Sequence, residues 1–286
     1  MRKYLIIFFF LPAVCFSETS VWKITKNGNE LFLGGTIHVL KKEDYPLPPE
    51  YAEAFKRANT LIFETNIEAS QTPEYSEKVT KLLSYPAGQS LKGAIKKDTF
   101  NQLKQYLADR NIPIESFEKL KPQMIVLIMT VLELKKMGMV DIGVDEYFYN
   151  KAKQAGKKVE YFETVDEQLE FLRTMGQGNE DSMILSTIKD MNQMHSIMNI
   201  LKTAWLHGNE DKLKKAGLDE MIRDYPETYQ SLLVKRNNNW MLHIEHMLNN
   251  KVIELVLVGA LHLVGQDGLL QQLRNKGYNV EKFKLK

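Results

Sequence analysis

The sequence has almost no cysteine. Cys15 is the only one among 286 residues, and it lies in the apolar segment at the start of the chain. A single cysteine cannot form an intramolecular disulfide, and beyond that segment no thiol is present to act as a nucleophile or a metal ligand. The fold therefore depends on its apolar core, and a chain of this length can bury a substantial one.

An excess of charge of one sign is also missing. The chain has 38 basic and 36 acidic residues, and Arg2 and Lys3 are the only charged residues before Glu18. The chain from residue 18 onward is therefore formally neutral. Without a basic excess, nucleic acid is not an expected partner.

Several enzyme signatures are absent from the sequence. It has no Gly-x-Ser-x-Gly elbow, no phosphate-binding loop and no dinucleotide fingerprint. These absences argue against a serine esterase, an ATPase and a dehydrogenase.

The sequence has no hydrophobic run long enough to span a bilayer comfortably. The apolar run at Tyr4–Phe16 is short, follows a basic start and precedes Ser17. This arrangement predicts a secretory signal peptide over residues 1–17, and hence an exported protein, periplasmic or secreted. An uncleaved anchor is the alternative. Lipid attachment at Cys15 is disfavoured because Val14 is larger than such sites prefer.

The remaining chain, 18–286, predicts one α/β (α+β) domain. Its apolar runs alternate with helical patterns, which indicates a central mixed sheet covered by helices. An Asn-Gly turn at 27–28 predicts a hairpin between strands at 21–26 and 30–34. The long helical stretch in the middle predicts a large helical insertion or cap beside the sheet. Further strands are expected at 60–63, 159–162, 252–258 and 280–285, and helices at 50–58, 124–134 and 269–276.

Two segments far apart in the sequence match each other. LFLGGTIHVL (31–40) and LVLVGALHLV (255–264) each read as a buried strand followed by Gly-x-x-His. A glycine can take turn angles that other residues cannot, and ligands bind at the carboxyl edge of open α/β sheets. The residues concerned are Gly35, His38, Gly259 and His262.

Glu64 follows the expected strand at 60–63, so its carboxylate is predicted at the same edge as His38 and His262. Two histidines and one carboxylate with open positions form a common catalytic metal site. Locally satisfied histidines are the alternative interpretation of the pattern.

Two further acidic residues admit two interpretations each. Asp145 could be a ligand or orient a histidine, but its place before a helix favours an N-cap. Glu163, at a strand end, could equally contact the site or cap the next helix.

Arg236 could clamp a carboxylate or a developing oxyanion, or form an ordinary salt bridge. His243 and His246 share a helix face, but they are not in a His-Glu-x-x-His motif, which favours a polar surface.

Seven motifs spread along the chain carry a family resemblance: LGGTIHVL, FETN (63–66), GVD (143–145), ETVDEQLEFL (163–172), AWLHGNED (204–211), RNNNW (236–240) and GALHLVGQDGLLQQL (259–273). In this order they resemble the TraB/PrgY/GumN family, to which the secreted Wnt-clipping TIKI proteases are also similar. The resemblance implies a fold related to the erythromycin-esterase and ChaN-like group. It also implies a metal-dependent hydrolase site at His38, Glu64 and His262, with Arg236 and Asn237 as polar support.

The sequence and the resemblance together favour an exported metal-dependent hydrolase. The expected substrate is a peptide or a small molecule, and the expected cofactor is a divalent ion such as manganese, cobalt or zinc. The ion would activate water, with Glu64 as a ligand or as the general base. The alternative is a binding protein that takes up a peptide, haem or metal without turnover.

Overall fold

The computed structural model describes residues 19–285. The predicted signal peptide, residues 1–17 with Cys15 and Ser17, lies outside this range. Of the described residues, none belongs to a helix with the length and apolarity that a membrane span requires.

The centre of the molecule is a six-stranded mixed sheet. The spatial order of its strands is β6-β4-β7-β2-β1-β8. The pairs β6–β4, β4–β7 and β7–β2 are parallel. Strand β1 is antiparallel to both β2 and β8. The predicted α/β class with a mixed sheet is therefore confirmed. The strands are β1 (Val21–Lys26), β2 (Asn29–Thr36), β4 (Thr60–Phe63), β6 (Lys158–Tyr161), β7 (Glu254–Gly259) and β8 (Asn279–Lys282).

The predicted hairpin joins β1 to β2. Asn27 and Gly28 have φ angles of 53° and 77°, and Lys26 pairs with Asn29 across the turn. Two residues with positive φ are what a tight hairpin turn of this hand requires. The local Asn-Gly signal therefore placed this turn correctly.

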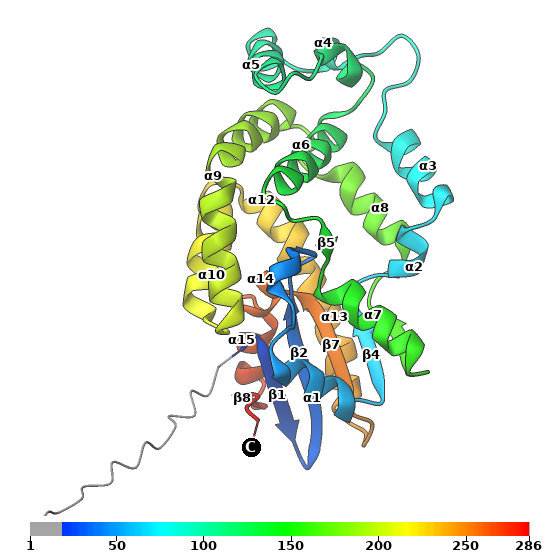
Figure 1. Cartoon of the computed structure of the whole chain (residues 1–286), viewed down its shortest axis with the longest axis vertical. Helices are drawn as coiled ribbons and strands as arrows, with labels where there is room; N and C mark the ends of the chain where they lie inside the picture. Colours follow the sequence, from blue (N-terminus) through cyan, green and yellow to red (C-terminus); the bar gives the residue numbers. More distant parts are fainter. Residues whose placement is uncertain (1–18, 286) are drawn as a thin grey trace, which may run out of the picture.

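Strands β4, β7 and β2 form the buried middle of the sheet. All four residues of β4 and the first five of β7 are buried, since helices cover both faces. Figure 1 shows α1 and α7 in front of the sheet and α13 behind it. The helices around the sheet are α1 (Pro49–Arg57), α7 (Val144–Gln154), α10 (Glu210–Gly217), α11 (Asp219–Asp224), α12 (Pro226–Tyr229), α13 (Lys235–Met247), α14 (Ala260–Leu263) and α15 (Leu269–Asn275).

A helical region lies beyond the end of the sheet, at the top of Figure 1. It has its own cluster of buried side chains, centred on Leu103, Phe117, Ile125 and Ile184. This region corresponds to the predicted helical insertion. Its helices are α2 (Ile67–Ser70), α3 (Pro73–Leu82), α4 (Leu91–Ala94), α5 (Lys97–Ala108), α6 (Pro122–Lys136), α8 (Val165–Thr174) and α9 (Glu180–Leu206).

Helix α6 departs from its predicted role as a fully buried core helix. Ile125 and Met129 are buried, but Val131 and Leu132 are exposed. The apolar run in the sequence is continuous, so it could not show which of its faces packs against α9. A short antiparallel pair, β3 (Val39–Leu40) with β5 (Asp141–Ile142), ties the segment after β2 to the segment before α7.

Candidate functional site

The two matched segments are neighbours in the sheet. Strands β2 and β7 run parallel, and Thr36 pairs with Gly259. Beyond the strands the paths differ: His38 lies in the loop between β2 and β3, whereas His262 lies in the one-turn helix α14. The predicted convergence of two histidines at one edge of the sheet therefore has its structural basis in adjacent strands.

The glycines of the two motifs serve a purpose other than the predicted one. Neither Gly35 nor Gly259 has a positive φ, so the expectation of an unusual turn angle is wrong. A Cβ on Gly35 would lie 3.2 Å from the Cα of Ala260, which shows that strand and helix pack closely there. At Gly259 the nearest atom to such a Cβ is instead Oε1 of Glu64, in the site itself.

His38 is held by a carboxylate on helix α7. Its Nδ1 lies 3.0 Å from Oδ2 of Asp145, while 67% of the His38 side chain is exposed. The favoured N-cap interpretation of Asp145 is wrong, because Gly143 occupies the cap position without a side-chain bond. Gly143 packs so closely on the backbone of His38 that a Cβ there would clash. The negative charge of Asp145 raises the pKa of His38 to about 9.

His262 is buried and is held by an amide. Its Nδ1 lies 2.7 Å from Oδ1 of Asn237, whose Nδ2 donates to the backbone oxygens of His262 and Asp267. Because Nδ2 is the donor, Oδ1 must accept, so His262 carries its proton on Nδ1 and has a lone pair on Nε2. Burial lowers the pKa of His262 to about 3. It is therefore neutral at physiological pH.

Glu64 lies between the two strand ends. The N–H of Gly259 donates to its Oε1 at 2.6 Å, and Nη2 of Arg236 donates to its Oε2 at 2.6 Å. Burial by itself would raise the pKa of Glu64, but the neighbouring positive groups and the Gly259 N–H outweigh it and lower the pKa to about 2. The carboxylate is therefore ionised throughout the physiological range.

Arg236 on α13 joins the groups of the site. Besides Glu64, it binds Glu163 in a bidentate pair, with Nε and Nη2 at 2.6 and 2.9 Å from the two oxygens. Its Nη1 lies 3.2 Å from Nε2 of His262. Glu163 contacts the site and does not cap α8, since Thr164 supplies that cap. In this structure Arg236 therefore forms salt bridges with two carboxylates of the protein itself, as the salt-bridge interpretation expected.

Trp240 also belongs to the site, although the sequence analysis gave it no role there. It is 1% exposed, its Nε1 donates to Glu163 at 3.0 Å, and its ring lies 4.5 Å from that of His262. Its position one turn after Arg236 in the RNNNW motif is the signal that places both on one helix face. Trp240 thus packs against the imidazole and supports the carboxylate that fixes Arg236.

The three predicted metal ligands surround one small space. A Cβ built on Gly259 would lie 3.3 Å from Oε1 of Glu64, 3.6 Å from Cδ2 of His262 and 3.9 Å from Nε2 of His38. Each histidine is oriented through Nδ1, by Asp145 or Asn237, as metal-binding histidines usually are. This donor set fits a divalent ion. Within the described range, however, no three such groups already form a metal cluster, and Arg236 occupies His262 and Glu64.

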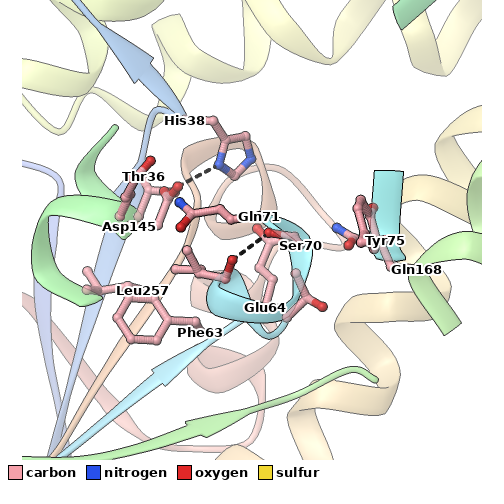
Figure 2. Close-up of a pocket in the computed structure, with 13 residues that line it drawn as sticks. Thr36, His38, Phe63, Glu64, Ser70, Gln71, Tyr75, Asp145, Gln168 and Leu257 are labelled. Carbon is pink, nitrogen blue, oxygen red and sulfur yellow. Dashed lines mark hydrogen bonds and ion pairs between the residues drawn. The ribbon is translucent and has the colours of Figure 1, made fainter. Parts of the chain in front are cut away.

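Pockets open on both sides of His38 and Glu64. One, of about 390 Å³, is bordered by polar residues that include Ser70, Gln71 and Gln168 (Figure 2). The other, of about 370 Å³, is mostly apolar and also includes Arg236 and His262. A substrate could therefore extend from the site in two directions with different chemistry.

Four other histidines lie outside these pockets. His243 and His246 are exposed on α13, which agrees with the polar-surface interpretation. His195 is exposed on α9 and contacts Asn199, and Nδ1 of His207 donates to the backbone oxygen of Thr203.

Comparisons with known proteins agree with the motif order. The uncharacterized protein YbaP of Escherichia coli K12 is 25% identical over 256 residues, covering 88% of this chain and 90% of its own. The protein of the same name from Shigella flexneri is 24% identical over the same length and the same shares. No solved structure matches the chain. The profile of the TraB/PrgY/gumN family matches residues 20–282, nearly the whole described range, and the chain therefore belongs to this family.

Proposed function

We propose that the protein is a metal-dependent hydrolase of an acyl bond, with peptides as the first substrates to test. The observation that carries this proposal is the shared orientation of the two histidines. Each has its Nδ1 bound by a partner, and each turns the rest of its ring toward the space beside Gly259 and Glu64. His38, His262 and Glu64 would hold the ion.

A bound divalent ion would lower the pKa of a water molecule and polarise the carbonyl group of the substrate. Glu64 serves as a ligand and not as the general base, because a carboxyl group with a pKa of about 2 is a weak base. Asp145 and Asn237 fix the orientations of His38 and His262. Asn237 also keeps the lone pair of His262 on Nε2, where a ligand can use it.

Arg236 supplies the positive charge of the site. Its Nε and Nη2 are held by carboxylates, whereas Nη1 contacts only His262 and, at 3.4 Å, the backbone oxygen of Leu232. Nη1 therefore becomes the donor available to a developing oxyanion when Nε2 of His262 binds another partner. Glu163 and the ring of Trp240 fix the position of the guanidinium.

The proposal is tested by the metal content of the purified protein and by cleavage of a peptide library with manganese, cobalt or zinc. We expect close to one ion per chain, a loss of at least tenfold in metal affinity in His38→Ala and His262→Ala, and no metal-dependent cleavage by either variant. The exposed His243→Ala on α13 is the matched control and should behave as wild type. Equal metal content in wild type and both site variants would show that the shared site is wrong.

Metal binding without metal-dependent cleavage would favour the alternative, an extracytoplasmic binding protein for a peptide, haem or metal.

We also propose export after removal of residues 1–17, on the strength of the basic start and apolar run of the sequence. Mass spectrometry of the protein from its native cell should find a chain that begins at Glu18. A retained Met1 would contradict this.

A further inference from the structure

We propose that the apolar pocket beside the site takes an unbranched acyl chain, whose carbonyl carbon is the one attacked. This inference rests on the proposed function, because it assigns the acyl side of the bond to be cleaved. It names the substrate class as long-chain acyl amides or esters with a polar head.

The pocket of about 370 Å³ begins at the site, where Glu64, Arg236 and His262 border it. A second pocket of about 380 Å³ adjoins it under the helical region and is also bordered by polar residues such as Asp190 and Glu220. The residues common to both pockets are Met194, Met198, Leu201, Met221 and Leu261. We call the two together the methionine groove. The site thus lies at one end of the apolar first pocket, and the methionines border the space beyond it.

The lining of the first pocket suits an acyl chain better than a peptide. A peptide backbone brings N–H and C=O groups, each of which needs a partner when it leaves water. Among the described residues that border this pocket, Thr130 and Trp205 are the side chains with a polar atom apart from those at the site end. The hydroxyl of Thr130 already donates to the backbone of Val126, and Nε1 of Trp205 already donates to the backbone oxygen of Gly35. Methionines adapt to varied apolar shapes, which suits chains of different length.

The polar pocket on the other side of Glu64 supplies the complement. Oγ1 of Thr65 and Oε1 of Gln168 are buried there without a hydrogen-bond partner. Both oxygens can accept a hydrogen bond, so they fit a head group that carries N–H or O–H donors. A substrate with an apolar chain, a central carbonyl and a donor-bearing head matches both pockets at once.

The test uses N-acylglycines with chains of 4, 8, 12 and 16 carbons as probes. Their binding to the full chain is measured by calorimetry in the presence of a chelator, so that the result does not depend on metal or turnover. We expect affinity to rise about three- to fourfold for each added methylene until the groove is filled. Met198→Trp should lower dodecanoylglycine affinity at least tenfold, while the volume-conserving Met198→Leu should stay within about twofold of wild type.

Three results would overturn the inference: affinity that does not depend on chain length, wild-type binding by Met198→Trp, or tighter groove-dependent binding of an apolar peptide of equal carbon count. Met221→Trp is the second blocking variant if Met198→Trp does not fold. A failed metal test with chain-length-dependent binding would count against the proposed hydrolysis alone. If both proposals hold, cleavage of an amide and of an ester with the same acyl chain distinguishes the two linkages.

Discussion

The histidines of the two matched segments lie in opposite electrostatic surroundings. His38, at the end of β2, is exposed and bound to the carboxylate of Asp145, which raises its pKa to about 9. His262, at the end of β7, is buried against Trp240 and bound to a neutral amide, and burial lowers its pKa to about 3. The same Gly-x-x-His motif thus yields one histidine that is cationic in the absence of metal and one that is neutral.

This difference has a chemical consequence. Titratable groups whose surroundings push their pKa values apart are able to take different roles in one site. The lone pair of His262 is available at every physiological pH. That of His38 becomes available only when its proton leaves, so metal affinity should increase as the pH rises toward 9.

The largest expected effect comes from removing the guanidinium of Arg236, which contacts Glu64 and His262 beside the end of β7. Arg236→Met leaves the carboxylates of Glu64 and Glu163, which are 13% and 12% exposed, without their partner. We expect a loss of about 3–5 kcal/mol in the free energy of unfolding, measured by urea denaturation, because uncompensated buried charge is costly. The pKa of His262 should rise at the same time, as followed by NMR titration, because one of the positive charges that disfavour its protonation is removed.

Arg236→Lys is the matched control. A lysine keeps the charge but cannot bind two carboxylates through a planar fork, so it should recover only part of the loss. A loss below about 1 kcal/mol in Arg236→Met would contradict the assigned role of the guanidinium.

The two motif glycines allow a direct comparison of packing with function. Gly35→Ala places a methyl group against Ala260 and Leu263, so we expect a loss of about 1–3 kcal/mol in stability. Gly259→Ala places its methyl group 3.3 Å from Oε1 of Glu64, where only side-chain atoms would have to shift. It should cost less than about 1 kcal/mol but abolish metal binding and hydrolysis. Urea denaturation and metal analysis of both variants test this, and the reverse assignment of effects would refute it.

The smallest effect is expected at Asp145. Asp145→Asn removes the charge that raises the pKa of His38, which should fall toward its ordinary value of 6.5. Because the folded-state pKa is raised, the wild-type ion pair contributes stability below pH 6.5 and loses it as the pH rises through 9. Solvent exposure of His38 limits this contribution to about 1 kcal/mol or less.

NMR titration of His38 and urea denaturation between pH 5 and 10 check this prediction. The stability of Asp145→Asn should vary less with pH over this window than that of wild type. An unchanged His38 pKa in the variant would contradict the electrostatic cause.

Much of the sheet could be predicted, and the reason is local. Strands β1 and β4 lie where their alternating or apolar runs placed them, and the Asn-Gly turn joins β1 to β2. Glu64 and the two histidines were predicted at one edge because residues that follow parallel strands meet there. The relation to the erythromycin-esterase and ChaN-like group stays a prediction, as does the single domain over 18–286.

The roles of Asp145, Glu163 and Trp240 could not be predicted in this way. Asp145 meets His38 across 107 residues of sequence, and Trp240 meets Glu163 across 77. For Asp145 the sequence favoured a local helix cap, and for Glu163 a cap was as consistent with the sequence as a contact in the site. Only the packing of α7 and α13 onto opposite faces of the sheet distinguishes them.

By itself the sequence determined the strands, the edge of the sheet where the site lies and the identity of the histidines and the carboxylate there. These follow from periodicity and turn chemistry, which act over a few residues. The tertiary structure decided the protonation of each histidine, because burial and charge at a side chain come from segments that are distant in sequence. The matched Gly-x-x-His motifs are alike in sequence, yet their partners, Asp145 and Asn237, make them chemically different.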